Sequence, residues 1–406
     1  MEKERHNAAM GNPAMKKVFS METLVFVILF FAFFGVIGSR MGVINMLNTM
    51  MNTAFDLLIN TCFYIMAVAV LAGAAASLFT EFGVVAVINK ILSPLMKPIY
   101  GLPGASILGI LATYLSDNPA ILTIAENRGF KQYFKKYQLP AFCSLGTAFG
   151  MGLIITTFMM GIASPCKESF VKPALIGNLG AVFGSVVSVR IMLFFTVRYY
   201  GTKVWCETER EEEKLDLDTY RTIRPGSIPV RFINAMLDGA KSGVKMGMTI
   251  IPGVLIICTI VMLLTNRASS DGTFTGAAYE GIGIIPVLGE KLEFILQPLF
   301  GFASAENIAV PVTALGAAGA AIGLVPGMVS EGLAGGNEIA VFTAMCMCWS
   351  GYLSTHVAMM DSLKCPEMTE KVIISQTIGG VAAGVAATWH HGLVSLIRRP
   401  IGRCLF

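Results

Sequence analysis

Long apolar stretches, each bounded by charged residues, proline or glycine, dominate the pattern of this chain. Seven of them are long enough to cross a bilayer, because a spanning helix needs about 20 mainly apolar residues. The pattern predicts a transmembrane helix over each of seven ranges: 20–39, 57–80, 139–163, 173–197, 244–265, 337–359 and 372–389.

Two further apolar regions, 84–126 and 284–328, are interrupted repeatedly by glycine and proline and carry polar residues in their middle. Backbone groups that are freed inside lipid need hydrogen-bond partners, so irregular backbone at membrane depth is expected only where it is buried or lines a cavity. We therefore expect discontinuous or re-entrant helices in these two regions.

The two halves of the chain match each other at a constant offset of 200 positions. "LMKPIYGLPGA" is answered by "ILQPLFGFASA", and "NLGAVFGSV" by "TIGGVAAGV". Small-residue helices can match by chance, but here the matches include proline and glycine. The matched pairs are Pro98 with Pro298, Gly101 with Gly301, Thr113 with Thr313, Phe142 with Phe342, Gly180 with Gly380, and Gly184 with Gly384.

Polar stretches divide the chain into five parts. A charged segment at 206–231 is a linker between the halves, and a polar, glycine-rich segment at 266–279 is a smaller loop. We predict an N-terminal tail with one extra transmembrane helix (1–45), a first repeat (46–200), a charged cytoplasmic linker (201–232), a second repeat (233–397) and a basic tail (398–406).

Lysine and arginine positions predict the orientation in the membrane, since cytoplasmic loops carry an excess of both. The N-terminus, the segment 90–136 and the linker are basic and are all expected in the cytoplasm, which makes the second repeat inverted relative to the first. The counterpart of the basic loop 128–137 is 330–338, which has two acids and no base. The same layout sends the basic C-terminal tail outside, against the rule, so the side of the C-terminus stays open.

Composition supports the membrane reading: 54% of the residues are hydrophobic and only 14% are charged, against roughly 25% in soluble domains. The positive charges do not gather into a groove with interleaved aromatics, so we expect no nucleic-acid partner. We predict an all-α, polytopic integral protein of the cell (inner or plasma) membrane, with a cytoplasmic N-terminus, in contact with the lipid bilayer and able to form a homo-oligomer.

In the first broken region, the polar residues Ser116, Asp117 and Asn118 precede Pro119. Proline forces the preceding residue away from helical geometry, and Ser, Asp or Asn can cap the helix that resumes after it. Asp117 is therefore either an N-cap or a functional acid, and an ionisable group at membrane depth favours the functional reading.

In the second broken region, the polar group is Ser304, Glu306 and Asn307, followed by Pro311. Few bases lie near Glu306 in the sequence, and an unpaired carboxylate in such a setting either stays protonated or binds a cation. The alternative is an interfacial glutamate that caps a helix.

Asn178 and Gln376 occupy similar places in the two repeats and complete the candidate substrate-binding set, although hydrogen bonding between helices is the commoner use of such residues. The sequence has no nucleophile with a nearby base, no phosphate-binding GxxxxGK[ST] and no HExxH. We therefore expect no enzyme activity, no metal site and no cofactor, apart from a coupling ion such as Na⁺ or H⁺.

The segments "LPGASILGILATYLSDNPAI" and "FASAENIAVPVTALGAAGA" resemble the nucleoside-recognition or gate domain family. This family includes concentrative nucleoside transporters, the membrane part of ferrous-iron transporters and spore-maturation membrane proteins. The resemblance covers 57–197 and 240–390 and implies inverted repeats with re-entrant hairpins whose polar tips bind solute and a coupling cation. The fuller Gln-Thr-Glu pattern of the nucleoside transporters and the GTPase domain of the iron transporters are missing here.

Inverted repeats with one broken segment each are typical of secondary transporters that bind substrate near the midplane. The first hypothesis is thus a cation-coupled transporter for a small polar solute, either nucleoside-like or another small metabolite. The alternatives are a non-transporting scaffold or assembly protein of the spore-maturation type and a metal-ion permease.

Overall fold

The structure of the protein is a computed structural model that describes residues 18–116, 118–126, 128–131, 133–206, 223–268 and 272–397. In these ranges the chain forms helices and no strand, apart from one isolated bridge between Lys135 and Trp205. Six helices are long and apolar enough to cross a membrane, and two bent helix pairs bring the number to eight. The expectation of an all-α polytopic membrane protein is confirmed.

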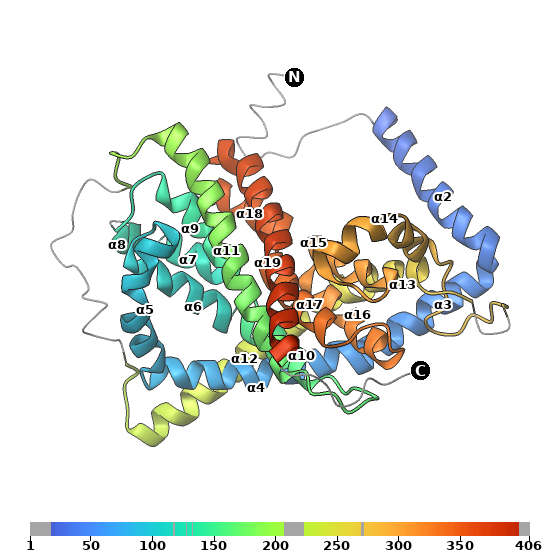
Figure 1. Ribbon diagram of the computed structural model, residues 1–406, viewed down its shortest axis with the longest axis horizontal. Helices are drawn as coiled ribbons and strands as arrows, with labels where there is room; N and C mark the ends of the chain where they lie inside the picture. Colours follow the sequence, from blue (N-terminus) through green and yellow to red (C-terminus); the bar gives the residue numbers. More distant parts are fainter. Residues whose placement is uncertain are drawn as a thin grey trace.

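The long helices form the frame of the molecule (Figure 1). Two of them are composite, because a π-helical turn joins two α-helical parts without a bend large enough to divide them. The frame comprises α2 (Met21–Met41), α3 (Val43–Asp56) with η1 (Leu57–Cys62) and α4 (Phe63–Glu81), α11 (Val171–Tyr200), α12 (Ile228–Gly253) with η3 (Val254–Cys258) and α13 (Thr259–Thr265), and α19 (Thr369–Ile397).

The predicted spans 57–80 and 244–265 are shorter than the helices that contain them, which run over Val43–Glu81 and Ile228–Thr265. The extra turns of the first helix carry amides that hydropathy counts against a span. Asn45 Nδ2 donates to the Phe274 carbonyl and Asn52 Nδ2 to the Gly276 carbonyl, both at 2.8 Å. A neighbouring loop thus satisfies these side chains and allows the helix to continue.

Between the long helices, the two halves contain similar series of short elements, which differ in that only the first has α8 and only the second has η5. The first half has α5 (Val84–Tyr100), η2 (Gly104–Ser106), α6 (Ile107–Leu115), α7 (Pro119–Glu126), α8 (Arg128–Lys131), α9 (Gln138–Thr147) and α10 (Gly152–Gly161). The second half has α14 (Ile284–Phe300), η4 (Ala305–Ile308), α15 (Ala309–Gly316), α16 (Ala318–Ser330), α17 (Gly336–Cys348), α18 (Tyr352–Ser362) and η5 (Pro366–Met368).

The backbone repeats the 200-residue offset seen in the sequence. Left-handed glycines flank α5 at Gly83 and Gly101, with φ of 85° and 75°, and their counterparts Gly283 and Gly301 flank α14 with φ of 63° and 61°. After each of these helices the chain turns sharply, by 107° in the first half and 76° in the second. The broken regions predicted over 84–126 and 284–328 are therefore present, as bent helix pairs followed by a returning helix.

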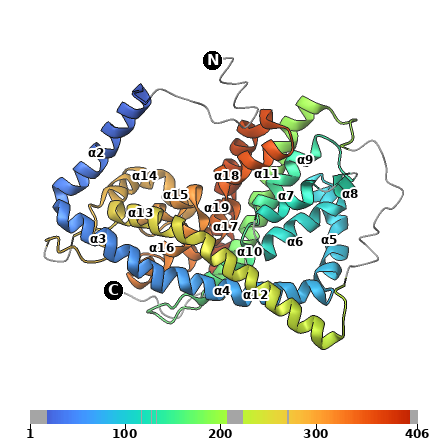
Figure 2. The ribbon, with the colours of Figure 1, turned by 180° about the vertical axis from the view of Figure 1, so that it is seen from behind.

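Equivalent helices of the two halves pack against each other and run in opposite directions. On α4 and α12, a Cβ on Gly73 would lie 2.5 Å from the Gly239 carbonyl oxygen, whereas one on Gly247 would lie 2.3 Å from Met66 Cγ. The residue numbers at the contacts thus increase along one helix as they decrease along the other, so the two helices are antiparallel. Figure 2 shows α12 crossing α4 at this point.

The helices α11 and α19 repeat this arrangement in the centre of the molecule (Figure 1). Gly180 faces the carbonyl of Ala383, and Gly184 faces the carbonyl of Gly379, so these helices are also antiparallel. Because equivalent helices point in opposite directions, one half is inverted relative to the other, as predicted. The glycines Gly180, Gly184 and Gly379 thus allow α11 and α19 to approach each other closely.

Two predicted spans are broken. The range 139–163 is divided into α9 and α10 by residues 148–151, and the range 337–359 is divided into α17 and α18 by residues 349–351. Both breaks contain a left-handed residue, Met151 with φ of 55° and Gly351 with φ of 65°, again 200 positions apart. Hydropathy does not detect these breaks, because apolar residues continue through them.

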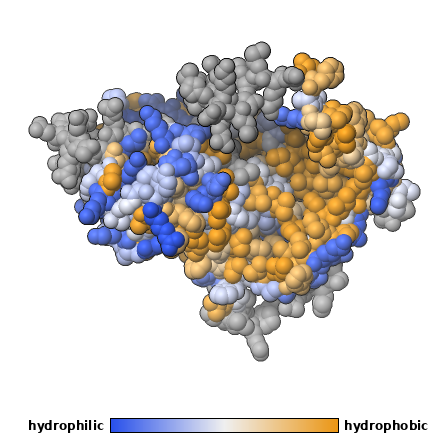
Figure 3. All heavy atoms as spheres, turned by 90° about the horizontal axis from the view of Figure 1, so that it is seen from above, coloured by the Kyte–Doolittle hydropathy of each residue, from blue (hydrophilic) through white to orange (hydrophobic). Residues whose placement is uncertain are grey.

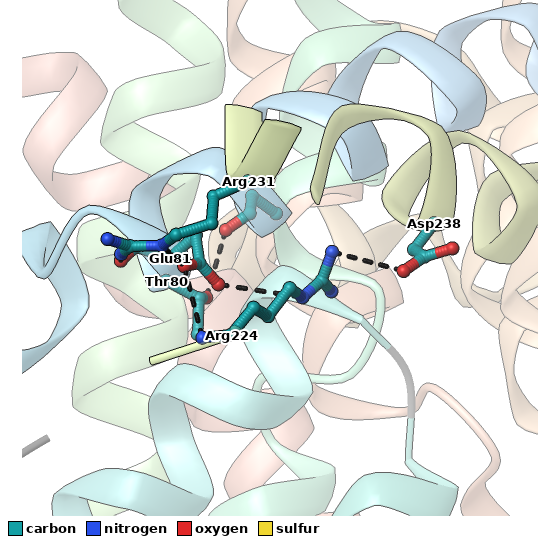
Figure 4. A network of polar contacts seen from close by, with 6 residues as sticks. Thr80, Glu81, Arg224, Arg231 and Asp238 are labelled. Carbon is teal, nitrogen blue, oxygen red and sulfur yellow. Dashed lines mark hydrogen bonds and ion pairs between the residues drawn. The ribbon is translucent and has the colours of Figure 1, made fainter. Parts of the chain in front are cut away.

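An ion-pair network ties the linker's end to the crossing of α4 and α12 (Figure 4). Glu81, 6% exposed, accepts from Arg231 Nε at 2.7 Å and lies 3.5 Å from Arg224 Nε. Arg224 Nη1 also lies 3.0 Å from Asp238 Oδ2. The network joins three segments and fixes the end of α4 on α12.

Apolar side chains cover much of the face shown in Figure 3. Helix α2 is the most exposed of the long helices, since only 11% of its most apolar 18-residue stretch is buried in the protein. Large side chains such as Phe26 and Phe31 are exposed. By contrast, 94% of the corresponding stretch over Gln138–Gly161 is buried. The broken helix α9–α10 thus lies inside the molecule, whereas at most 50% of the apolar stretch of each frame helix is buried.

Candidate functional site

The tip of the first hairpin meets both helix breaks. Asn118, buried between α6 and α7, donates from Nδ2 to the Ser350 carbonyl at 2.8 Å and to Ser350 Oγ at 3.1 Å. A Cβ on Gly150 would lie 2.2 Å from Asn118 Oδ1, so only glycine leaves room for this amide in the α9–α10 break. Of its predicted neighbours, Ser116 ends α6, and Asp117 lies outside the described residues.

Gln376 holds the second break rather than facing a cavity. In an unbroken helix the Tyr352 amide would bond the Cys348 carbonyl, but here it bonds the Trp349 carbonyl at 3.1 Å. Gln376 Nε2 donates to the Cys348 carbonyl at 2.6 Å, and Gln376 Oε1 accepts from Ser188 Oγ at 2.6 Å. The buried side chain thus replaces the lost backbone partner.

Asn178 also has all of its polar atoms engaged. Its Oδ1 accepts from the Tyr114 hydroxyl at 2.9 Å, and its Nδ2 donates to Thr156 Oγ1 at 2.8 Å and to the Ala174 carbonyl at 2.9 Å. Thr156 belongs to α10 and Tyr114 to α6, so Asn178 links the hairpin and the broken helix to α11. Both Asn178 and Gln376 remain predicted substrate ligands, but in this conformation they bind protein groups.

Sequence reasoning passed over a polar pair next to the breaks. Thr147, the last residue of α9, lies with Oγ1 2.9 Å from His356 Nε2 of α18, and both side chains are fully buried. Along its own helix, His356 has no neighbour at metal-ligand spacing, so α18 alone gives no signal of a site. The signal that could have found the pair is the 200-residue offset, which places the two broken helices in equivalent positions.

The predicted set Ser304, Glu306 and Asn307 lies away from this junction. These residues form the start of the second hairpin, at η4, and their counterparts at the 200-residue offset are residues 104–107. The tip of the second hairpin is at residues 316–317, between α15 and α16. Ser304 begins a helix whereas Ser116 ends one, so the two predicted polar groups lie at different points of their hairpins.

Glu306 borders a large cavity of about 950 Å³. The cavity lies between the frame helices, through η1, α4 and α13, and the inner elements α10, α15 and α16. Ser304 Oγ donates to Glu306 Oε2, and Arg267 Nη2 lies 4.0 Å from Glu306 Oε1. Asn307 is fully buried behind it, where Nδ2 donates to the Leu333 carbonyl at 2.9 Å.

The remaining polar residues of the cavity were not predicted. Asp56 accepts hydrogen bonds from Asn60 Nδ2 at 2.7 Å and from the Tyr279 hydroxyl. Glu331 follows α16 and is exposed. In the sequence Asp56 precedes an apolar run, as a boundary residue does, and Glu331 lies in the acidic counterpart of the basic loop, so neither indicates a binding site.

The described residues contain no group of three or more His, Cys, Asp or Glu side chains placed to hold a metal ion. The acids around the cavity come from different elements, α3, η4 and the residue after α16.

No protein-family model matches the chain, and no curated protein matches it. Two solved structures of the concentrative nucleoside transporter CNTnw share its fold. The inward-facing, substrate-bound state is 13% identical with a TM-score of 0.51, covering 91% of this chain and 84% of that chain. A doubly substituted variant in an outward-facing state is 13% identical with a TM-score of 0.50, covering 92% and 84%. The expected resemblance is confirmed as a concentrative-nucleoside-transporter-like fold.

Proposed function

We propose that this protein is a secondary transporter for a small polar solute, coupled to Na⁺ or H⁺. One observation carries the proposal: two inverted copies of one unit each contain a bent hairpin and a helix broken inside the protein, at residues 148–151 and 349–351. Broken helices expose backbone donors and acceptors that can bind a solute within the bilayer.

The arrangement also favours movement over a static scaffold. Asn118 bonds the break of the opposite repeat through Ser350, and the cavity beside Glu306 separates the frame helices from the inner elements. A scaffold has no need of either feature. The inner elements could shift along the frame if these contacts were exchanged for contacts with the solute, which is the alternating access that inverted repeats permit.

Uptake by liposomes that contain the purified chain tests the proposal. A solute that binds the protein should accumulate under an inward Na⁺ or H⁺ gradient and not without one. Glu306→Gln and Asp117→Asn should each abolish uptake, whereas Glu293→Gln, the same change at an exposed position of α14, should leave it intact. Full uptake by both Glu306→Gln and Asp117→Asn would remove these acids from the site, and absence of uptake for every bound solute would refute transport.

A further inference from the structure

We propose that the cavity beside Glu306 selects a small organic cation, a polar solute that carries a protonated amine; this inference rests on the transport function proposed above. The charge of the lining is the first argument. Three carboxylates, from Asp56, Glu306 and Glu331, face the cavity, and Arg267 is the one basic residue among the described residues that line it. An ammonium group would therefore enter a region of net negative charge.

The helices around the cavity add to this negative field. Three of them end there: α10 at Gly161, α13 at Thr265 and α16 at Ser330, and all three residues line the cavity. The C-terminal end of a helix carries about half a negative charge, so three ends favour a cation. The start of η4 is the opposing helix N-terminus, and Glu306 in its first turn offsets its positive end.

A hydroxyl group without a partner faces the same space. Thr61 lines the cavity from the π-helical turn η1, is 8% exposed, and its Oγ1 makes no hydrogen bond within the described part of the chain. A buried hydroxyl normally finds a partner, and π-helical turns occur frequently at functional sites. The oxygen of Thr61 is thus free to accept a hydrogen bond from an ammonium group.

The carboxylates also repel one another. Although Glu331 is exposed, partial desolvation of its carboxyl group raises its pKa, and the negative charge of Glu306 raises it further. Arg267 relieves this repulsion poorly, because its guanidinium is 66% exposed and is shared with Glu290 at 3.8 Å. A bound ammonium group would supply the missing positive charge and compete with Arg267 for Glu306.

Binding of matched solutes to the purified full chain in detergent tests the charge preference. Three sets share a frame and differ in charge: glucosamine, glucose and glucuronate; tryptamine, indole-3-ethanol and indole-3-acetate; 5′-amino-5′-deoxyadenosine, adenosine and adenosine-5′-carboxylate. Thermal stabilisation by each solute gives its Kd. We expect the amine of at least one set to bind about tenfold or more tightly than its neutral partner, the gain of a charge-assisted hydrogen bond.

Substitutions connect that preference to the cavity. Glu331→Gln and Glu306→Gln should each weaken amine binding about tenfold, and Thr61→Val about threefold to tenfold. Arg267→Gln should strengthen it, which loss of structure could not do. Glu293→Gln is the matched control and should bind like the parent protein, and the melting temperature without solute checks that each variant is folded.

Separate outcomes bear on the cavity and on transport. Tighter binding of the neutral or acidic members, amine binding that Glu331→Gln leaves unchanged, or no binding by any amine would overturn the cation preference. Liposome uptake is read independently: if a neutral solute binds and accumulates, transport stands and the cation preference fails. If an amine binds through the cavity but never accumulates, the preference stands and transport fails.

Discussion

Replacing Gln376 with leucine should destabilise the protein by about 1–3 kcal/mol, the cost of leaving a buried acceptor without a partner. The acceptor is the Cys348 carbonyl at the end of α17, which Gln376 Nε2 reaches at 2.6 Å. Leucine fills a similar volume, so little of the loss should come from a cavity. Ser188→Ala should also destabilise, because it removes the hydroxyl that donates to Gln376 Oε1.

The double variant isolates the contact between the two side chains. Hydrogen bonds between membrane helices average about 0.6 kcal/mol and reach about 1.7 kcal/mol, so Ser188→Ala/Gln376→Leu should lose less than the sum of the single losses by an amount in that range. Reversible unfolding in mixed micelles measures the three free energies. Thr249→Ala, which removes an exposed hydroxyl bonded within its own helix, is the control for Ser188→Ala.

A coupling below about 0.3 kcal/mol, within the limit of additivity, would refute this reasoning. It would mean that Gln376 does not hold the break against α11 and that its amide is available to a solute. Solute binding distinguishes the two roles as well: if Gln376 is a direct ligand, Gln376→Leu weakens binding while Ser188→Ala leaves it unchanged.

Three further changes have expected outcomes. Gly243→Ala should destabilise by about 1–3 kcal/mol in thermal unfolding, because its Cβ would lie 2.4 Å from the Ala69 carbonyl oxygen, whereas Gly35→Ala, with no atom within 4 Å, should not. Lys364→Gly should stabilise the protein by about 1 kcal/mol in the same assay, because this exposed lysine has a left-handed backbone with φ of 57°. A loss of stability would show that contacts of the lysine side chain outweigh the backbone strain. Partial burial, and then the charge of Glu338, raise the pKa of Glu168 above 4.5. The folded protein therefore holds this proton more tightly than the unfolded chain, and stability should fall as pH rises through the raised pKa. Unfolding at a series of pH values measures this fall, which Glu168→Gln should reduce.

The sequence predicted the features that depend on hydropathy and on the offset between halves. The paired prolines and glycines at 98, 101, 298 and 301 correctly located two bent regions, because left-handed caps need glycine and proline limits helix length. The breaks at Met151 and Gly351 were missed, since Met151 is apolar and gives no signal of a left-handed backbone. The offset pairs Ser116 with Gly316, so the polar groups at 116–118 and 304–307 are not equivalent positions of the two repeats.

The site was harder to predict than the fold, because its residues meet only in three dimensions. Asp56, Thr61, Arg267 and Glu331 come from four separate segments, and each has an ordinary explanation in the sequence as a boundary, a buried hydroxyl or a loop charge. Arg267 and Glu306 are 39 positions apart, so the sequence gives no sign that they are partners. Only the packing of α13 near η4 and α16 brings their side chains to one cavity.

The helix breaks and the cavity beside Glu306 differ in how many of their polar groups are already hydrogen-bonded within the protein. At the breaks, the amide groups of Asn178 and Gln376 are saturated by protein partners, so a solute could bind there only after those bonds are exchanged. In the cavity, the hydroxyl of Thr61 has no partner among the described residues, and Glu306 shares one exposed guanidinium, that of Arg267, with Glu290. Under the proposed function, we therefore expect the cavity to recognise the solute in the present conformation and the breaks to exchange their hydrogen bonds when the inner elements move.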